Sequence, residues 1–185
     1  MMLNSIIVFD DIIDDQYQNF LQDTFITSKY YKKYNSSTLS SNDKRNVIDK
    51  NTIDVPFISC NLLAEQDIYH LPIVKNLNVN LNYSLNSYST QRARLNFTFK
   101  NKNYSDNNYS PIHKDAGYRD NAMVALYYVN DSDGDTFFFD NNLNIVKKIT
   151  PKKGKLVYWP NTIYHAGSSP KNFDIRCVIS FNFWQ

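Results

Sequence analysis

The spacing of apolar residues divides the chain near residue 88. Before that point apolar residues recur at helical spacing in two stripes, which are Ile13, Tyr17, Phe20, Leu21 and Phe25, and then Val74, Leu77 and Leu81. Acidic residues at 10–15 precede the first stripe and Pro72 precedes the second, and both residue types favour the first turn of a helix. Within residues 6–87 we therefore expect a short strand at 6–9 followed by two helices.

After residue 88 the period changes to two, which is typical of strands with one buried face. Between residues 92 and 99 the apolar set is Ala93, Leu95, Phe97 and Phe99, and the polar set is Arg92, Arg94, Asn96 and Thr98. Further apolar runs lie at 122–129, 136–139, 145–146, 155–159 and 175–183, with turn signals such as Asp133-Gly134 between them. Many short strands with regular turns indicate a mainly β sandwich or barrel, here with helices packed on one side.

Residues 36–54 break both patterns, because they are polar, charged and rich in Ser, Asn, Lys and Asp. We expect a long loop here, and its composition leaves open whether it is a functional lid or disordered.

Composition narrows the class of protein. The chain has 185 residues, 20 basic and 18 acidic side chains, and a net charge of +2, so it lacks the strongly basic balance of many nucleic-acid-binding domains. No apolar stretch is long enough to span a membrane, and acidic residues from Asp10 onward interrupt any signal-peptide core. Two cysteines do not make a disulfide framework. We expect a cytoplasmic protein with no membrane segment.

The candidate chemistry lies in the second half of the chain. His113 and Asp115 are two residues apart, so on an extended strand both side chains point to the same face. His165 follows in a stretch, residues 160–167, whose composition suggests turns. Two His and one carboxylate are the ligands of the facial triad that holds non-haem Fe(II) and leaves open positions. The remaining histidine, His70, is expected to be structural or exposed.

Arg176 stands out because its neighbours at 175 and 177–179 are apolar. A buried guanidinium needs an anionic partner, and a dicarboxylate cosubstrate would supply one.

From about Tyr104 to the C-terminus, the chain resembles the 2-oxoglutarate- and Fe(II)-dependent dioxygenases of the prolyl-4-hydroxylase-like group. The matching motifs, in order, are Tyr104, Tyr109, Pro111, His113 and Asp115; Tyr127 to Asn130; Gly134 to Phe137; Pro151 to Pro160 followed by His165; and Arg176. The resemblance implies a double-stranded β-helix, or jelly roll. It also implies a single dioxygenase domain over 1–185, with its core at about 88–185 and a helical N-terminal part at about 6–87.

The resemblance also assigns roles to residues. His113, Asp115 and His165 are expected to bind Fe(II), and Arg176 and Tyr104 to bind 2-oxoglutarate, with no catalytic side chain beyond the metal ligands. O₂ is the other cosubstrate, and ascorbate is a possible reductant. Asn96 and Thr98 are expected near the pocket. Arg92 and Arg94 share their face, and we expect these two charges to be solvated.

The implied reaction is hydroxylation of an unactivated C–H bond with release of succinate and CO₂. The expected substrate is a peptidyl or free amino acid, with proline the leading candidate. One alternative is an AlkB-like nucleic-acid demethylase, but Asn182 stands where those enzymes carry a second Arg, and we do not expect a nucleic-acid partner. Another is a non-catalytic cupin-like jelly-roll binding module. Residues 105–108, Ser-Asp-Asn-Asn, differ from the glycines common in the family and leave the substrate side undefined.

Overall fold

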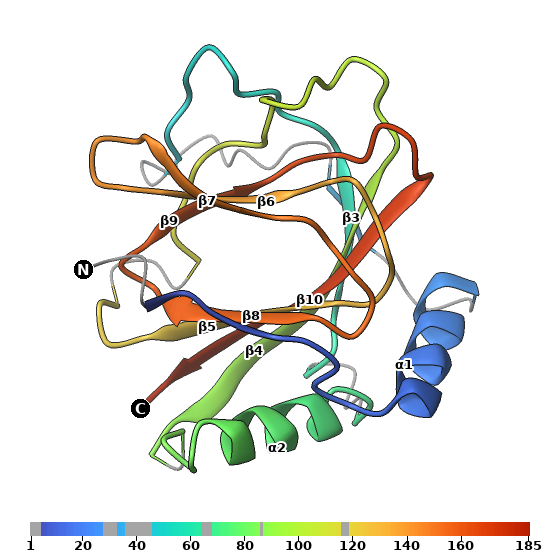
Figure 1. Cartoon of the computed structure of the whole chain (residues 1–185), viewed down its shortest axis with the longest axis vertical. Coiled ribbons are helices and arrows are strands. Elements are labelled where there is room, and N and C mark those ends of the chain that lie inside the picture. The colour runs from blue at the N-terminus through green and yellow to red at the C-terminus, as the bar shows by residue number, and fades with distance from the viewer. Residues whose placement is uncertain (1–4, 28–32, 36–45, 64–67, 86, 116–118) are drawn as a thin grey trace.

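In a computed structural model of the chain, the described residues are 5–27, 33–35, 46–63, 68–85, 87–115 and 119–185 (Figure 1). The helices are α1 (Asp15–Gln22), which continues as a π-helical turn (Asp23–Thr27), and α2 (Leu71–Asn80). The strands are β1 (Ile7–Phe9), β2 (Lys33–Asn35), β3 (Phe57–Asn61), β4 (Ser89–Phe99), β5 (Met123–Tyr128), β6 (Thr136–Phe139), β7 (Ile145–Ile149), β8 (Leu156–Pro160), β9 (Tyr164–Gly167) and β10 (Ile175–Trp184).

The strands form two sheets that face each other. The larger sheet has the order β1-β8-β5-β10-β4-β3-β2, and the smaller has the order β7-β6-β9. All described pairings between neighbouring strands are antiparallel. Beyond β4 the chain passes repeatedly between the sheets, because β5, β8 and β10 lie in the larger one while β6, β7 and β9 lie in the smaller one. This alternation is the jelly-roll arrangement expected from the sequence.

The two larger apolar cores follow from this layering. The core between the sheets contains Phe138 from the smaller sheet and Tyr128 and Trp159 from the larger one. The other core contains side chains of the larger sheet together with Leu21 of α1 and Leu77 of α2. Both helices therefore pack on the outer face of the larger sheet, as Figure 1 shows, which confirms the expected placement of helices on one side.

The two expected helices form where their sequence signals lie. The Asp14 side chain accepts a hydrogen bond from the Tyr17 backbone N–H at 2.9 Å and caps α1, as expected from the acidic cluster. Pro72 occupies the first turn of α2. One member of the first apolar stripe differs from expectation, because Phe20 is 42% exposed.

One local prediction was wrong. His165 lies in strand β9 rather than in a turn, because β9 pairs with β6 and places His165 opposite Phe138.

In the expected loop at 36–54, residues 46–54 are hydrogen-bonded to the segment that precedes the metal motif. Val47 and Ile112 exchange backbone hydrogen bonds of 2.8 and 3.0 Å, and the Ile53 N–H donates to the Tyr109 carbonyl at 2.9 Å. Residues 36–45 lie outside the described residues.

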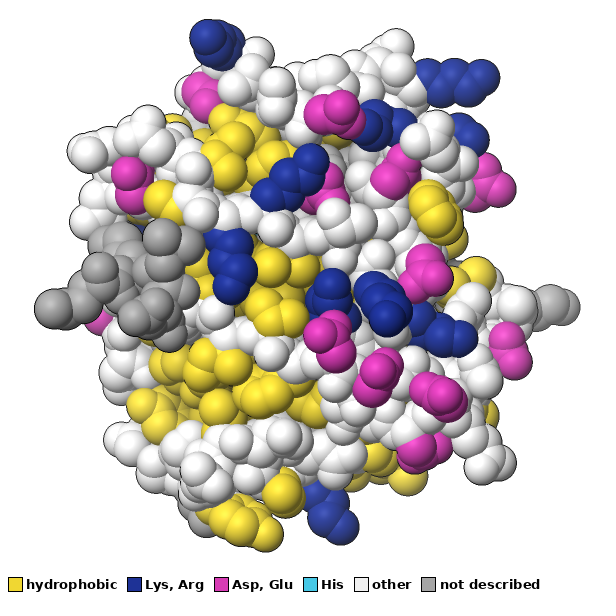
Figure 2. All heavy atoms as spheres, viewed as in Figure 1, with side chains coloured by type: hydrophobic (Ala, Val, Ile, Leu, Met, Phe, Trp, Pro, Cys, Tyr) yellow, Lys and Arg dark blue, Asp and Glu magenta, His cyan; other side chains and the backbone are white. Residues whose placement is uncertain are grey.

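The surface agrees with the balanced composition. On the face shown in Figure 2, basic and acidic side chains are interspersed and no large patch of a single sign is visible. None of the helices in the described ranges has the length and hydropathy needed to cross a membrane.

Candidate active site

Three side chains predicted as metal ligands converge in the structure. One potential ligand atom from each of His113, Asp115 and His165 lies within 4.8 Å of the other two. The Oδ1 atom of Asp115 is 3.3 Å from Nε2 of His113 and 3.7 Å from Nε2 of His165. Backbone pairing sets this geometry, because His113 and His165 exchange N–H···O hydrogen bonds of 2.9 and 3.0 Å.

Both imidazoles are oriented to bind a metal ion through Nε2. Nδ1 of His113 lies 2.8 Å from the Pro111 carbonyl oxygen and donates a hydrogen bond to it, so Nε2 is the nitrogen that faces Asp115. Burial and the neighbouring His113 lower the pKa of His165, against the opposing effect of Asp115. The His165 ring also packs 5.0 Å from the Trp159 ring, measured between centroids, on an apolar wall. Nε2 of each histidine thus points to the same place, beside Asp115.

Asp115 is held as a carboxylate by contacts on its other oxygen. Oδ2 lies 3.1 Å from the Arg92 guanidinium and accepts a hydrogen bond of 3.0 Å from the Ser180 hydroxyl, so Oδ1 is left to face the imidazoles. Burial raises the pKa of Asp115, but Arg92 and the two histidines outweigh burial and hold this pKa well below its usual value. Two imidazoles and one oriented carboxylate fit a divalent transition metal such as Fe(II).

A cavity of about 270 Å³ between the sheets connects this triad with Arg176. Arg176 is the second residue of β10 and is buried, with a residue exposure of 6%. It donates a hydrogen bond of 2.8 Å to the Thr136 hydroxyl, and its guanidinium lies 5.8 Å from the centre of the Tyr128 ring. The Arg176 guanidinium is therefore a buried positive charge at one end of the cavity.

The Arg176 charge has no carboxylate partner among the described residues. The nearby Asp135 instead forms an ion pair of 2.8 Å with Lys148, and Nε of Arg176 is buried without a hydrogen-bond acceptor. Burial lowers the pKa of Arg176, although an arginine remains charged at neutral pH. An unpaired buried guanidinium beside a cavity fits a carboxylate ligand, which accepts two parallel hydrogen bonds from it.

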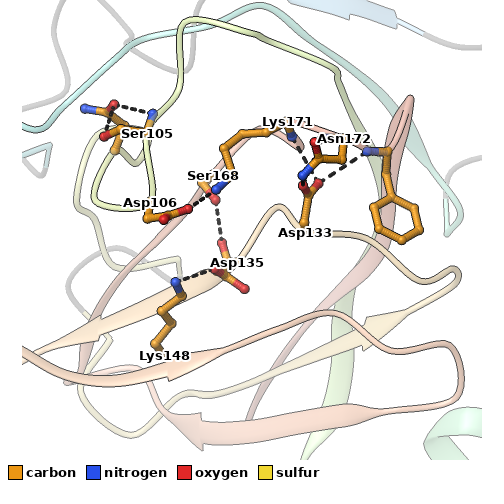
Figure 3. A network of polar contacts seen from close by, with 10 residues as sticks. Ser105, Asp106, Asp133, Asp135, Lys148, Ser168, Lys171 and Asn172 are labelled. Atoms are coloured by element: carbon orange, nitrogen blue, oxygen red, sulfur yellow. Dashed lines mark hydrogen bonds and ion pairs between the residues drawn. The ribbon is translucent and has the colours of Figure 1, made fainter.

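A polar network, drawn in Figure 3, fixes the loops that surround Arg176. Asp133 accepts backbone hydrogen bonds from Lys171 at 3.0 Å and Asn172 at 2.9 Å. The Ser168 N–H donates to the Asp135 carbonyl at 2.8 Å. These contacts hold the loop after β9 against the loop before β6, and so keep Ser168 in the cavity wall.

Gly134 lies where these two loops meet, and no side chain fits there. A Cβ atom at this position would lie 2.6 Å from the Ser168 carbonyl oxygen and 2.9 Å from Cδ of Arg176. We expect Gly134→Ala to lower the free energy of unfolding by about 1–3 kcal/mol, as overpacked sites do, and to weaken 2-oxoglutarate binding because Arg176 must move. Denaturant unfolding and titration of the manganese-loaded protein with 2-oxoglutarate measure both effects. Metal affinity is the internal control, and wild-type 2-oxoglutarate affinity in the variant would contradict the prediction.

The structure does not support the expected role of Tyr104. Its hydroxyl donates a hydrogen bond of 2.6 Å to the Ile53 carbonyl, and the residue does not line the cavity. Burial raises the pKa of Tyr104 to about 12, so the phenol stays protonated. Tyr104 lies behind the cavity wall, because its hydroxyl is hydrogen-bonded to the Ile53 carbonyl in the segment at 46–54.

The polar face of β4 forms one wall of the cavity. Asn96 and Thr98 line it as expected, but Arg92 and Arg94 line it too, which corrects the expectation that these two charges are solvated. The smaller sheet covers this face, so it points into the molecule. The sequence analysis also missed Thr136 and Ser180, although Ser180 lies four residues after Arg176 on the same face of β10.

A jelly roll with two histidines, one carboxylate and a buried arginine around one cavity is the arrangement of a non-haem metal oxygenase. Residues 99–184 match the model of a family described as the 2OG-Fe(II) oxygenase superfamily. The comparison with curated proteins finds no significant match.

Solved structures share the fold at low identity. A 2OG-Fe(II) oxygenase family oxidoreductase from Burkholderia pseudomallei has a TM-score of 0.67 and 10% identity, and the match covers 97% of this chain and 85% of that one. The viral collagen prolyl hydroxylase of Paramecium Bursaria Chlorella virus-1 has a TM-score of 0.61 and 14% identity, over 97% and 95% of the two chains. A prolyl hydroxylase from Trichoplax adhaerens, solved with a fragment of hypoxia inducible factor, has a TM-score of 0.62 and 14% identity, over 98% and 84%.

These matches confirm the resemblance inferred from the sequence. The fold is the mainly β jelly roll of these enzymes, and the family match over residues 99–184 together with this fold indicates a 2-oxoglutarate-dependent oxygenase that uses Fe(II). These findings favour an enzyme over the cupin-like binding module.

Proposed function

We propose that His113, Asp115 and His165 bind the Fe(II) and that Arg176 binds the distal carboxylate of 2-oxoglutarate. The convergence of the three side chains within 4.8 Å, on the same cavity as the unpaired Arg176, is the observation that carries this proposal. Nε2 of His113 and Oδ1 of Asp115 lie 3.3 Å apart, while Arg92 and Ser180 contact the other carboxylate oxygen. Iron bound there supplies O₂ activation coupled to the conversion of 2-oxoglutarate to succinate and CO₂.

The surroundings of the triad suit this chemistry. His165 packs against two aromatic rings, with centroid distances of 5.0 Å to Trp159 and 6.4 Å to Phe138. These rings hold the imidazole in one orientation and exclude water from behind it. The protein thus contributes binding, orientation and a dry wall, and the bound iron carries the oxidation.

We further propose that the reaction is hydroxylation of an amino acid, either free or within a peptide, with proline the leading candidate. The stretch from Tyr104 to Asp115 resembles that of prolyl hydroxylases, and two structures with the same fold are prolyl hydroxylases. The fold also occurs in an epimerase from nogalamycin biosynthesis, so the fold alone does not select the substrate.

Product analysis tests this proposal. We expect the iron-loaded protein to release succinate from 2-oxoglutarate and to add 16 mass units, that is one oxygen atom, to an amino acid or a proline-containing peptide. Mass spectrometry after incubation with free amino acids, peptides and methylated oligonucleotides distinguishes the outcomes. Demethylated oligonucleotide without any oxidised amino acid or peptide would overturn the proposal in favour of an AlkB-like demethylase.

A further inference from the structure

The cavity has more positive charge than the triad and 2-oxoglutarate account for. Among the described residues that line it, four side chains are basic, namely Arg92, Arg94, Lys114 and Arg176, and one, Asp115, is acidic. Arg92 is paired with Asp115 at 3.1 Å, and the Lys114 ammonium lies 4.6 Å from the centre of the Tyr164 ring. Arg176 is assigned above to 2-oxoglutarate. Arg94 and Lys114 are the two cations left without an assigned anion, and of the two only Arg94 has a buried nitrogen without a hydrogen-bond acceptor.

Arg94 is poorly compensated by the protein. It is half-buried, its guanidinium lies 5.7 Å from the centre of the Phe57 ring, and its Nε atom is buried without a hydrogen-bond acceptor. Within the part of the chain that the structure describes, no carboxylate forms an ion pair with it. Burial lowers the pKa of Arg94 to about 10, and Arg92 adds to this effect while Asp115 opposes it. A partly desolvated cation of this kind favours an anionic ligand.

The register of the sheet places Arg94 at the metal end of the cavity. On β10, Arg94 is opposite Ser180, whose hydroxyl binds Asp115, whereas Thr98 is opposite Arg176. Arg94 and Thr98 are four residues apart on one strand face, a separation of about 13 Å at the usual rise per residue. Arg94 and Arg176 therefore lie at different ends of the pocket. The end near Arg94 is where the primary substrate has to approach the metal.

We propose that Arg94 binds a carboxylate of the primary substrate, and that this substrate is a small carboxylic acid of the free amino acid type. This inference rests on the proposed function, because it assigns one end of the same cavity to 2-oxoglutarate. A residue inside a peptide offers only neutral amides at the corresponding position, so it would leave Arg94 unpaired. The cavity of about 270 Å³ is also small for a site that holds two ligands. An arginine fork matches a planar carboxylate in two hydrogen bonds.

Calorimetric titration of the manganese- and 2-oxoglutarate-loaded protein with each of the standard free L-amino acids, and with their carboxamides, tests the inference. We expect at least one free amino acid to bind, and its carboxamide to bind about 30-fold more weakly or worse, as loss of one partner of a close charge pair does. Arg94→Gln should weaken binding of the free acid by a similar factor. Arg94→Lys should recover part of it.

The control is Arg119→Gln, which removes the same charge outside the cavity, where Arg119 lies 4.9 Å from the centre of the Trp184 ring. Binding of a free amino acid should be unchanged in this variant. The inference is overturned if no free amino acid binds, if acid and carboxamide bind equally, or if Arg94→Gln binds like the wild type. If 2-oxoglutarate binds normally to the wild type and to Arg94→Gln, such a result rejects only the role of Arg94 and leaves the proposed function intact. Absence of 2-oxoglutarate binding in the wild type would instead reject the proposed function.

Discussion

Asp115→Asn is expected to lower metal affinity by more than about 100-fold and to abolish succinate formation, since even residues that only support metal ligands contribute 10–100-fold. The amide keeps the shape of the side chain but removes the negative charge. That charge is what Arg92 at 3.1 Å and the two imidazoles stabilise in the wild type. The variant therefore leaves Arg92 without its partner and gives the metal a neutral, weaker ligand.

Metal titration and a succinate assay on the same preparation measure both effects. Asp120→Asn is the matched control, because it removes an exposed carboxylate five residues further along that does not line the cavity. Wild-type metal affinity in Asp115→Asn would contradict the assignment of Asp115 as a ligand.

The second large effect is expected from Arg176→Ala, which should weaken 2-oxoglutarate binding by about 2–5 kcal/mol while the metal still binds. Arg176 is buried and unpaired among the described carboxylates, and it contacts the Thr136 hydroxyl at 2.8 Å. Removing it takes away the cation at that end of the cavity, so the distal carboxylate of the cosubstrate would be buried without a partner.

Titration of the manganese-loaded variant with 2-oxoglutarate gives the change in affinity directly. Arg176→Lys keeps the charge without the planar fork and should lie between the alanine variant and the wild type. Equal affinity for 2-oxoglutarate in the alanine variant and the wild type would show that Arg176 has a structural role only.

Much of the fold could be predicted because local periodicity reports which faces are buried. The alternation at 92–99 identified β4, and the stripes through Leu21 and Leu77 identified the two helices on the larger sheet. The strand that carries His165 was missed because its Pro, Asn and Gly neighbours are typical of turns. Its pairing with β6 is a tertiary contact that a local pattern does not contain.

The candidate site, like the fold, could be predicted from the sequence only in part. The spacing of His113 and Asp115, and the isolated charge of Arg176, were sufficient to select residues that the structure brings to one cavity. Arg94 was expected in solvent, because a two-residue period separates two faces of a strand but does not show which one another sheet covers. Tyr104 was expected in the pocket, but its hydroxyl is bound by the Ile53 carbonyl from a segment 51 residues away.

An anaerobic crystal structure with Fe(II) and 2-oxoglutarate bound is the most direct test of the central assignment. The expected result is one metal ion held by Nε2 of His113, Nε2 of His165 and a carboxylate oxygen of Asp115, at about 2.0–2.3 Å, with the distal carboxylate of 2-oxoglutarate on Arg176. A metal ion bound elsewhere, or 2-oxoglutarate bound without contact to Arg176, would contradict it.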